Sequence, residues 1–216
     1  MIATCPWLSS AASLEVLKAF PSIITAITAI IGLAFAKRGL DKWHAETIGK
    51  RKAELAEQAL AAFYEARDVF IWVRSPGMFG REGESRTAAA EETDQQRRDR
   101  NTLFVPLERL TRNAELFARI YTLRYSFAAH FGPAAIEPFQ AIHMAQVEIS
   151  STVGVLIQLV DASGTTAGYR GHDSDAELRS TLWGAPERPD KFDKAIETAV
   201  QQIEHFCRPV LEKAAP

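Results

Sequence analysis

Apolar residues recur every three or four positions along most of the chain, which is the spacing of one face of an α-helix. Over residues 40–74 two such rows lie side by side: Leu55, Ala59, Ala62, Ala66, Val69 and Val73, beside Ala56, Leu60, Phe63 and Phe70. A stripe of this width is typical of a helix that faces a protein core. The sequence Ser75-Pro76-Gly77 then predicts the end of this first helix.

Three later stretches show the same helical spacing, over residues 102–131, over residues 135–161 and from about residue 190 onward. Their apolar rows are Leu103, Leu107, Leu110, Ala114, Phe117 and Tyr121; Phe139, Ile142, Ile149, Val153, Leu156 and Val160; and Phe192, Ile196, Ala199, Ile203, Phe206 and Val210. No stretch alternates apolar and polar residues for long enough to predict a strand. The chain is therefore predicted to be all-α, with an antiparallel four-helix-like bundle.

Two long polar connections separate these helices, over residues 75–100 and residues 163–190. The first is rich in charge and poor in large apolar residues, which predicts a surface loop or a locally disordered segment. The second contains a short helical pattern that ends at Trp183-Gly184. Asp190 is expected to cap the last helix, because aspartate at that position accepts bonds from the first backbone N–H groups.

The N-terminal segment, residues 1–36, contains an uncharged run over residues 20–36 that is long enough to cross a bilayer as one helix. The flank that follows, residues 37–52, carries six Lys and Arg residues against two acidic ones. Basic flanks stay on the cytoplasmic side of a membrane. The sequence thus predicts a single-pass anchor in the cell membrane, in contact with lipid through residues 20–36, with residues 37–216 forming a cytoplasmic bundle.

Two other interpretations of the apolar run remain open. Ala34-Phe35-Ala36 fits the small-residue cleavage site of an exported protein, although a signal peptide begins with a basic region and residues 1–19 hold one Lys. In the other interpretation the run is a buried core helix of a soluble protein. Gly32 and Ala36 also have the small-residue spacing that brings two spans together, so the sequence is compatible with a homo-oligomer.

Composition removes several classes of protein. The chain has 216 residues with 25 Lys and Arg against 27 Asp and Glu, a formal net charge of −2, so no nucleic-acid partner is expected. Its 2 cysteines are too few for a disulfide scaffold or a Cys-rich zinc module. The sequence has neither a phosphate-binding loop nor a nucleophile elbow, and it predicts no cofactor.

The adjacent pair His172-Asp173 is the strongest enzymatic candidate. With His143 upstream and Asp193 downstream it is similar to the ligand set of helical HD-type phosphohydrolases, and the resemblance implies that these four residues hold a hydrolytic divalent metal. The pair lies in the Gly- and Ser-rich stretch GYRGHDSD, whereas rigid ligands are best held on packed helices. The sequence therefore favours a non-enzymatic protein over an enzyme.

The leading hypothesis is a membrane-anchored helical bundle with an interaction, scaffold or sensory role and a protein partner. The two polar connections would supply the binding surface, because function concentrates on exposed loops. An HD-like metal-dependent phosphohydrolase and a soluble or exported helical protein are the two alternatives.

Overall fold

The computed structural model describes the backbone of residues 10–89, 91–163, 173–185 and 187–214, and their side chains except those of residues 10–23, 26, 162, 163 and 173–175. The helices are α1 (Ser10–Val73), α2 (Asp94–Arg112), α3 (Ala114–Phe131), the short 3-10 helix η1 (Pro133–Ile136), α4 (Glu137–Ser163), α5 (Asp173–Trp183) and α6 (Lys191–Ala214). No strand occurs among the described residues, so the all-α prediction is confirmed.

The chain divides into two compact units, residues 1–50 and residues 51–216, and α1 contributes residues to both. In the first unit every described side chain from residue 24 to residue 50 is exposed. Part of the span predicted over residues 20–36 lies outside the described side chains, namely residues 20–23 and 26. Among the helices of the described residues, none is long and apolar enough to cross a membrane, so the predicted span is not found there.

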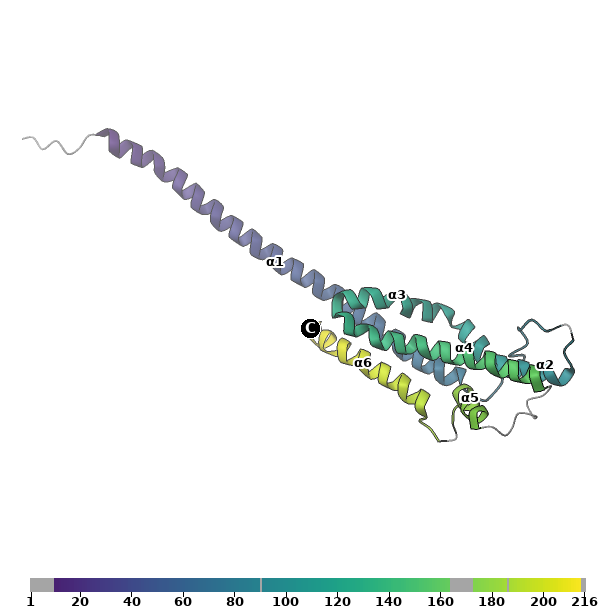
Figure 1. The fold of residues 1–216 in the computed structure, drawn as a ribbon. Helices are drawn as coiled ribbons and strands as arrows, with labels where there is room; N and C mark the ends of the chain where they lie inside the picture. The colour runs from purple at the N-terminus through teal and green to yellow at the C-terminus, as the bar shows by residue number, and fades with distance from the viewer. Residues whose placement is uncertain (1–9, 90, 164–172, 186, 215–216) are drawn as a thin grey trace, which may run out of the picture. The chain divides into compact units, whose positions relative to one another are not determined.

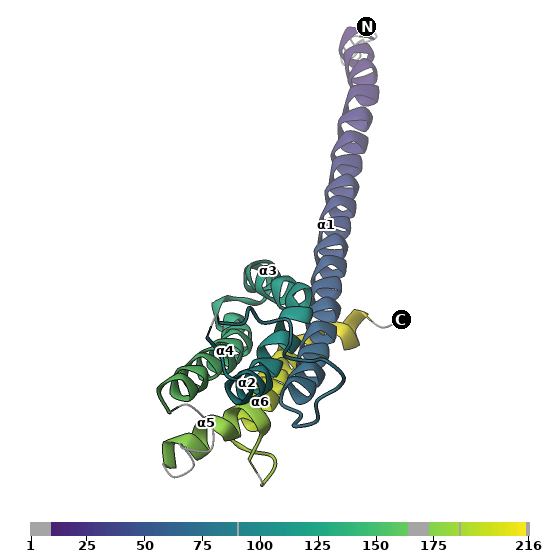
Figure 2. The ribbon, with the colours of Figure 1, turned by 90° about the vertical axis from the view of Figure 1, so that its right-hand side faces the viewer.

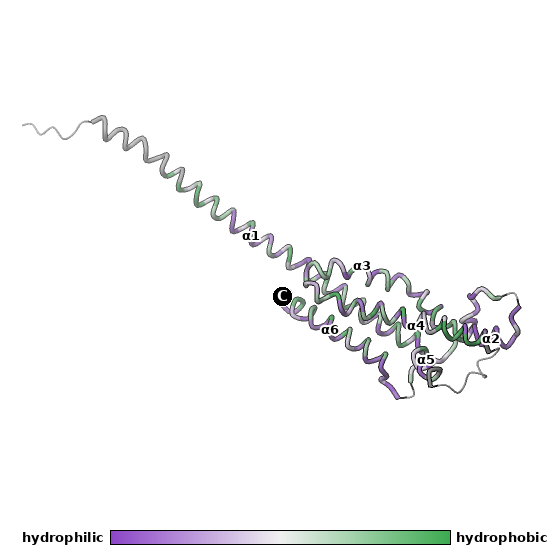
Figure 3. The backbone as a smooth tube through the Cα atoms, viewed as in Figure 1, coloured by the Kyte–Doolittle hydropathy of each residue, from purple (hydrophilic) through white to green (hydrophobic). Residues whose placement is uncertain are grey.

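The second unit is a helical bundle. Residues 51–73 of α1 pack beside α3, α4 and α6, as two views of the ribbon show (Figure 1, Figure 2). Phenylalanine rings join the helices: Phe63 of α1 lies 5.0 Å from Phe139 of α4, and Phe70 of α1 lies 5.4 Å from Phe117 of α3, between ring centroids. Figure 3 shows apolar positions recurring along each of these helices, which is the pattern that a shared core requires. The predicted helical bundle is confirmed.

The helix expected over residues 102–131 is two helices, and it begins earlier than predicted. Thr93 caps α2 through a capping box, in which its hydroxyl accepts from the backbone N–H of Gln96 at 3.2 Å and the Gln96 side chain accepts from the backbone N–H of Thr93 at 3.0 Å. Asn113 separates α2 from α3, and its side chain donates to the backbone oxygen of Arg109 at 2.8 Å. The first polar connection is therefore shorter than residues 75–100.

The second connection contains α5, which ends at Trp183 as predicted. Asp190 caps α6, because its carboxylate accepts from the backbone N–H of Asp193 at 2.9 Å while the Asp193 carboxylate accepts from the backbone N–H of Asp190 at 3.3 Å. This reciprocal pair fixes the start of α6 and places two carboxylates at one end of the bundle.

Candidate functional site

Two arginines, Arg109 and Arg74, are among the largest fully buried side chains of the bundle. The guanidinium of Arg109 donates to Glu82 Oε2 at 2.6 Å and to Oε1 at 3.2 Å. It also donates to the backbone oxygens of Trp72 at 2.9 Å, Ser75 at 2.8 Å and Gly77. Arginine suits such a position because its donors form a planar fork that one carboxylate and several carbonyls can satisfy. Arg109 thus ties α2 to the connection that follows α1.

The partner carboxylate, Glu82, is itself almost completely buried. Its Oε2 also accepts from the backbone N–H of Phe79 at 3.1 Å. The hydrogen bond from Arg109 is the main reason that the pKa of Glu82 lies below its ordinary value, and it outweighs burial, which acts in the opposite direction. Glu82 therefore stays ionised at neutral pH and holds the connection in one conformation.

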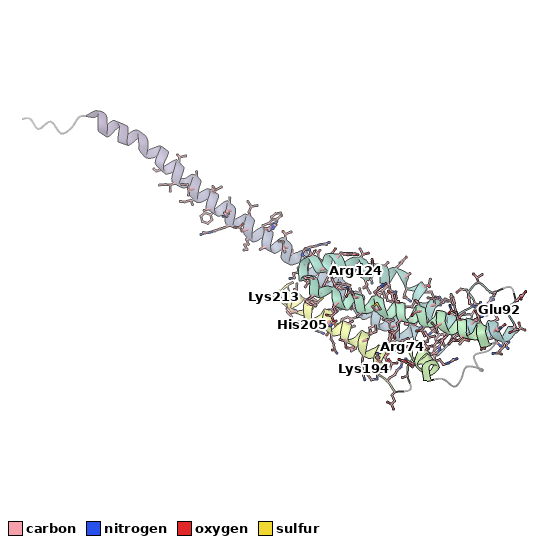
Figure 4. The ribbon with its side chains drawn as sticks, in the orientation of Figure 1. Arg74, Glu92, Arg124, Lys194, His205 and Lys213 are labelled. Carbon is pink, nitrogen blue, oxygen red and sulfur yellow. The ribbon has the colours of Figure 1, made fainter. Side chains whose placement is uncertain are left out.

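Arg74, the residue directly after α1, contacts the second connection, in α5 and just before α6. It donates to Asp190 Oδ2 at 2.6 Å, to Asp193 Oδ1 at 2.5 Å, and to the backbone oxygens of Ser180 at 2.8 Å and Thr181 at 2.9 Å. One buried guanidinium thereby joins the end of α1, the last turns of α5 and the first turn of α6. Figure 4 marks Arg74 close to the start of α6.

A third charged cluster surrounds Glu92, whose side chain is completely buried. Arg86 Nη1 lies 2.7 Å from its Oε1 and Arg100 Nη1 lies 2.5 Å from the same oxygen. Hydrogen bonds from Arg86 and Arg100 outweigh burial and lower the pKa of Glu92 to about 2. Arg100 of α2 also pairs with Asp161 of α4, so the cluster links these two helices. Figure 4 labels Glu92 at this end of the bundle.

The connection between α1 and α2 approaches α2 so closely that only glycine fits at one position. Gly83 has a φ of +83°, and a Cβ added there would lie 2.1 Å from the backbone oxygen of Asn101. Its backbone N–H donates to Glu108 Oε2 at 2.5 Å. The connection is thus attached to α2 before Glu82, through Gly77 and Arg109, and after it, through Gly83 and Glu108.

We expect Gly83→Ala to lower the free energy of unfolding by about 1–3 kcal/mol more than Gly80→Ala does, because an added methyl group collides with fixed backbone and overpacking costs that much. Gly80 is the matched control, since it also has a positive φ, +62°, but has nothing within 4 Å of an added Cβ. Urea unfolding of the two variants measures the difference. Equal losses would mean that the connection can move away from α2.

The residues proposed as metal ligands do not meet in the described part of the chain. His143 is exposed on α4, and Asp193 is engaged by Arg74. Asp173 begins α5, but its side chain and the whole of His172 lie outside the described residues. Among the side chains that the structure describes, no three His, Cys, Asp or Glu residues lie close enough together to hold a metal ion.

An exposed surface on α3 and α4 combines aromatic, basic and apolar side chains. We call it the Tyr–Arg patch, and it consists of the half-buried Arg124 and the exposed residues Tyr121, Tyr125, His143, Met144 and Val147. The ring centroids of Tyr121 and His143 lie 6.1 Å apart, which places the two helices side by side at this surface. Tyr125 is 60% exposed and Met144 is 61% exposed.

Arg124, marked on α3 in Figure 4, orders the two tyrosines of the patch. Its guanidinium carbon lies 3.7 Å from the ring centroid of Tyr121 and 4.5 Å from that of Tyr125. It also donates to the Tyr125 hydroxyl at 2.5 Å, and this bond lowers the pKa of Tyr125. The Nε atom of Arg124 is buried and has no hydrogen-bond partner in the described part of the protein. Arg124 therefore holds both tyrosine rings in place.

Tyr121 was predicted to lie in a core-facing row, and this prediction was wrong. Tyr121 follows Phe117 at helical spacing, but the break at Asn113 gives α3 its own orientation, and Tyr121 is 47% exposed. The buried arginines were missed as well, because a charged residue beside an apolar row looks solvated when its partners are distant in sequence. Local spacing held no signal for them, since Arg109 adjoins Leu110 of that row just as the exposed Thr111 does.

A comparison of the chain with known protein families, with curated proteins and with solved structures finds no match.

Proposed function

We propose that the protein is a membrane-anchored helical bundle that acts without catalysis, by binding another protein through the Tyr–Arg patch. The observation that supports this function is the preformed surface made by Tyr121, Arg124 and Tyr125. Tyrosine and arginine are enriched among the residues that dominate binding energy at protein interfaces. Because Arg124 already orders both rings, a partner loses little of its binding energy to immobilising them.

The neighbouring helix adds the apolar part of this surface. Met144 and Val147 lie within one turn of His143 on α4, and both are exposed. Methionine adapts its shape to a partner, and interface cores combine such residues with aromatic ones. A partner with an apolar side chain beside a carboxylate would fill this surface and bond to Arg124.

The anchor part of the proposal is supported by the uncharged run over residues 20–36 and the basic flank after it. In this arrangement the anchor keeps the bundle at the cytoplasmic face of the membrane. The positively charged flank would lie against anionic headgroups, where each Lys or Arg contributes about 1 kcal/mol.

Site-specific photo-crosslinking in cells tests the proposal. A photoreactive amino acid replaces Met144 in the full chain, and the same amino acid replaces Lys194, an exposed residue of α6, as the matched control. We expect one discrete crosslinked protein from position 144 in the membrane fraction, none from position 194, and loss of the product in Arg124→Ala.

A chain that lacks residues 1–36 serves as the second control and is expected in the soluble fraction. The same products from both positions, or none from either, would contradict the patch as the binding site. A full chain found in the soluble fraction would contradict the anchor.

A further inference from the structure

A cavity of about 500 Å³ lies on the bundle between the last turns of α1 and the first turns of α6. This volume is within the range of pockets that bind small molecules. The cavity belongs to neither the Tyr–Arg patch nor the charged clusters around Arg109 and Glu92. A ligand of this cavity would therefore bind apart from the proposed protein partner.

The inner wall of the cavity is apolar. Phe70 of α1 and Phe192 of α6 meet edge to face with their ring centroids 5.6 Å apart, and both rings are buried. Ile196 extends this wall along α6. Ile71, in contrast, is 54% exposed at the mouth of the cavity, which leaves room for an apolar group to cover it. A hydrocarbon or aryl body would remove mainly the exposed Ile71 side chain from water, with the buried rings and Ile196 forming the wall behind it.

The rim of the cavity carries guanidinium groups with unused donors. Arg67 bonds through Nε to Asp68 at 3.4 Å, and no described residue bonds to its two Nη atoms. Arg188 donates from Nη2 to the backbone oxygen of Trp183 at 3.4 Å, and its Nε lies 3.9 Å from Asp193. Guanidinium donors left open at the edge of an apolar cavity are suited to a carboxylate.

Of the two acidic residues of the rim, Asp193 is engaged through both of its carboxylate oxygens. Asp193 is bonded to Arg74 at 2.5 Å and to the backbone N–H of Asp190 at 3.3 Å. Glu197 accepts from Gln201 Nε2 at 3.4 Å. Glu197 keeps spare acceptors on the exposed face of α6. The open groups that the two arginines bring to the rim are donors, and a negative charge complements these donors.

We propose that this cavity binds a small apolar carboxylate, with an alkyl or aryl body on Phe70, Phe192 and Ile196 and its anionic head on the guanidinium groups of Arg67 and Arg188. Because Phe192 also lies under Arg74, whose guanidinium carbon is 4.3 Å from the ring centroid, an occupied cavity supports the start of α6. The bound ligand is expected to raise the temperature at which the bundle unfolds.

The test compares two water-soluble probes with one body and opposite heads, 4-phenylbutanoate and 4-phenylbutylamine. Each is titrated into the full chain in lipid nanodiscs and followed by saturation-transfer-difference NMR, with empty nanodiscs subtracted. We expect saturable binding of the acid and binding of the amine at least tenfold weaker.

Two variants assign the signal to the cavity. Ile71→Asp places a charge at the mouth and Arg67→Gln removes one rim cation, and both side chains are open enough that folding, checked by circular dichroism, is expected to persist. Each should weaken binding of the acid about tenfold or more, while Lys194→Gln, outside the cavity, should leave it unchanged. Equal binding of acid and amine, unchanged binding in both cavity variants, or no saturable signal overturns the proposal.

Discussion

Arg109→Met is expected to lower the free energy of unfolding by about 3–5 kcal/mol, because it leaves Glu82 buried without its cation. The lost guanidinium also releases the backbone oxygens of Trp72, in the last turn of α1, and of Ser75 and Gly77 in the connection to α2. A methionine side chain offers these oxygens no replacement donor. Methionine keeps much of the volume of arginine, so the effect reports the polar contacts and not a cavity. Urea unfolding followed by circular dichroism measures it.

Arg112→Met is the matched control, because Arg112 lies one turn of helix away and takes part in the same network from the surface. Its side chain is 52% exposed and lies 2.6 Å from Glu108 and 3.6 Å from Glu82. Exposed ion pairs contribute about 0–1 kcal/mol. If Arg109→Met and Arg112→Met lost the same free energy of unfolding, water would have to reach Glu82, and the buried network would not hold the connection.

The double variant Glu82→Gln with Arg109→Met separates the pair from its surroundings. Removing both charges leaves no unpaired buried charge. The double variant is therefore expected to lose less free energy of unfolding than the sum of the losses in the two single variants. Full additivity would show that Glu82 and Arg109 do not act as one unit.

The apolar rows predicted the bundle because helical spacing is a local property of the sequence. Phe63, Ile142 and Ile203 were each placed on a core-facing row, and all three are buried. The start of α6 was predicted from Asp190 for the same reason, since a cap acts on the turn directly after it. These features need no knowledge of which helix packs beside which.

The charged interior could not be predicted in the same way. Arg74 meets Asp190 across 116 positions of sequence, and Arg109 meets Glu82 across 27. Nothing in local spacing tells such an arginine from the solvated ones on either side of it. The Tyr–Arg patch escaped prediction for a related reason, since its exposure depends on how α3 turns at Asn113 and lies against α4.

The second large effect is expected at Arg74, because its buried guanidinium joins the end of α1 to α5 and α6. Burial alone would raise the pKa of Asp190, but hydrogen bonds from Arg74 and from the backbone N–H groups of Asp193 and Ala185 outweigh it and hold this pKa below its ordinary value. When folding lowers the pKa of a carboxylate, that group stabilises the fold at pH values above its ordinary pKa, which is near 4 for aspartate. This stabilisation is lost as the pH falls from there toward the pKa of the folded state.

We therefore expect Arg74→Met to cost about 3–5 kcal/mol at pH 7, and to cost less as the pH is lowered below about 4. At neutral pH the variant leaves two carboxylates at the start of α6 without their shared cation, whereas protonation removes that penalty. Urea unfolding at pH 7 and pH 3.5 measures the change, with Arg208→Met as the control.

Arg208 is exposed and pairs with Glu204 one turn away on α6 at 3.0 Å, so its loss should cost about 0.3–0.5 kcal/mol. A cost for Arg74→Met that stays constant with pH would mean that Asp190 does not depend on Arg74 for its charge, and that packing against Phe192 carries the contact instead.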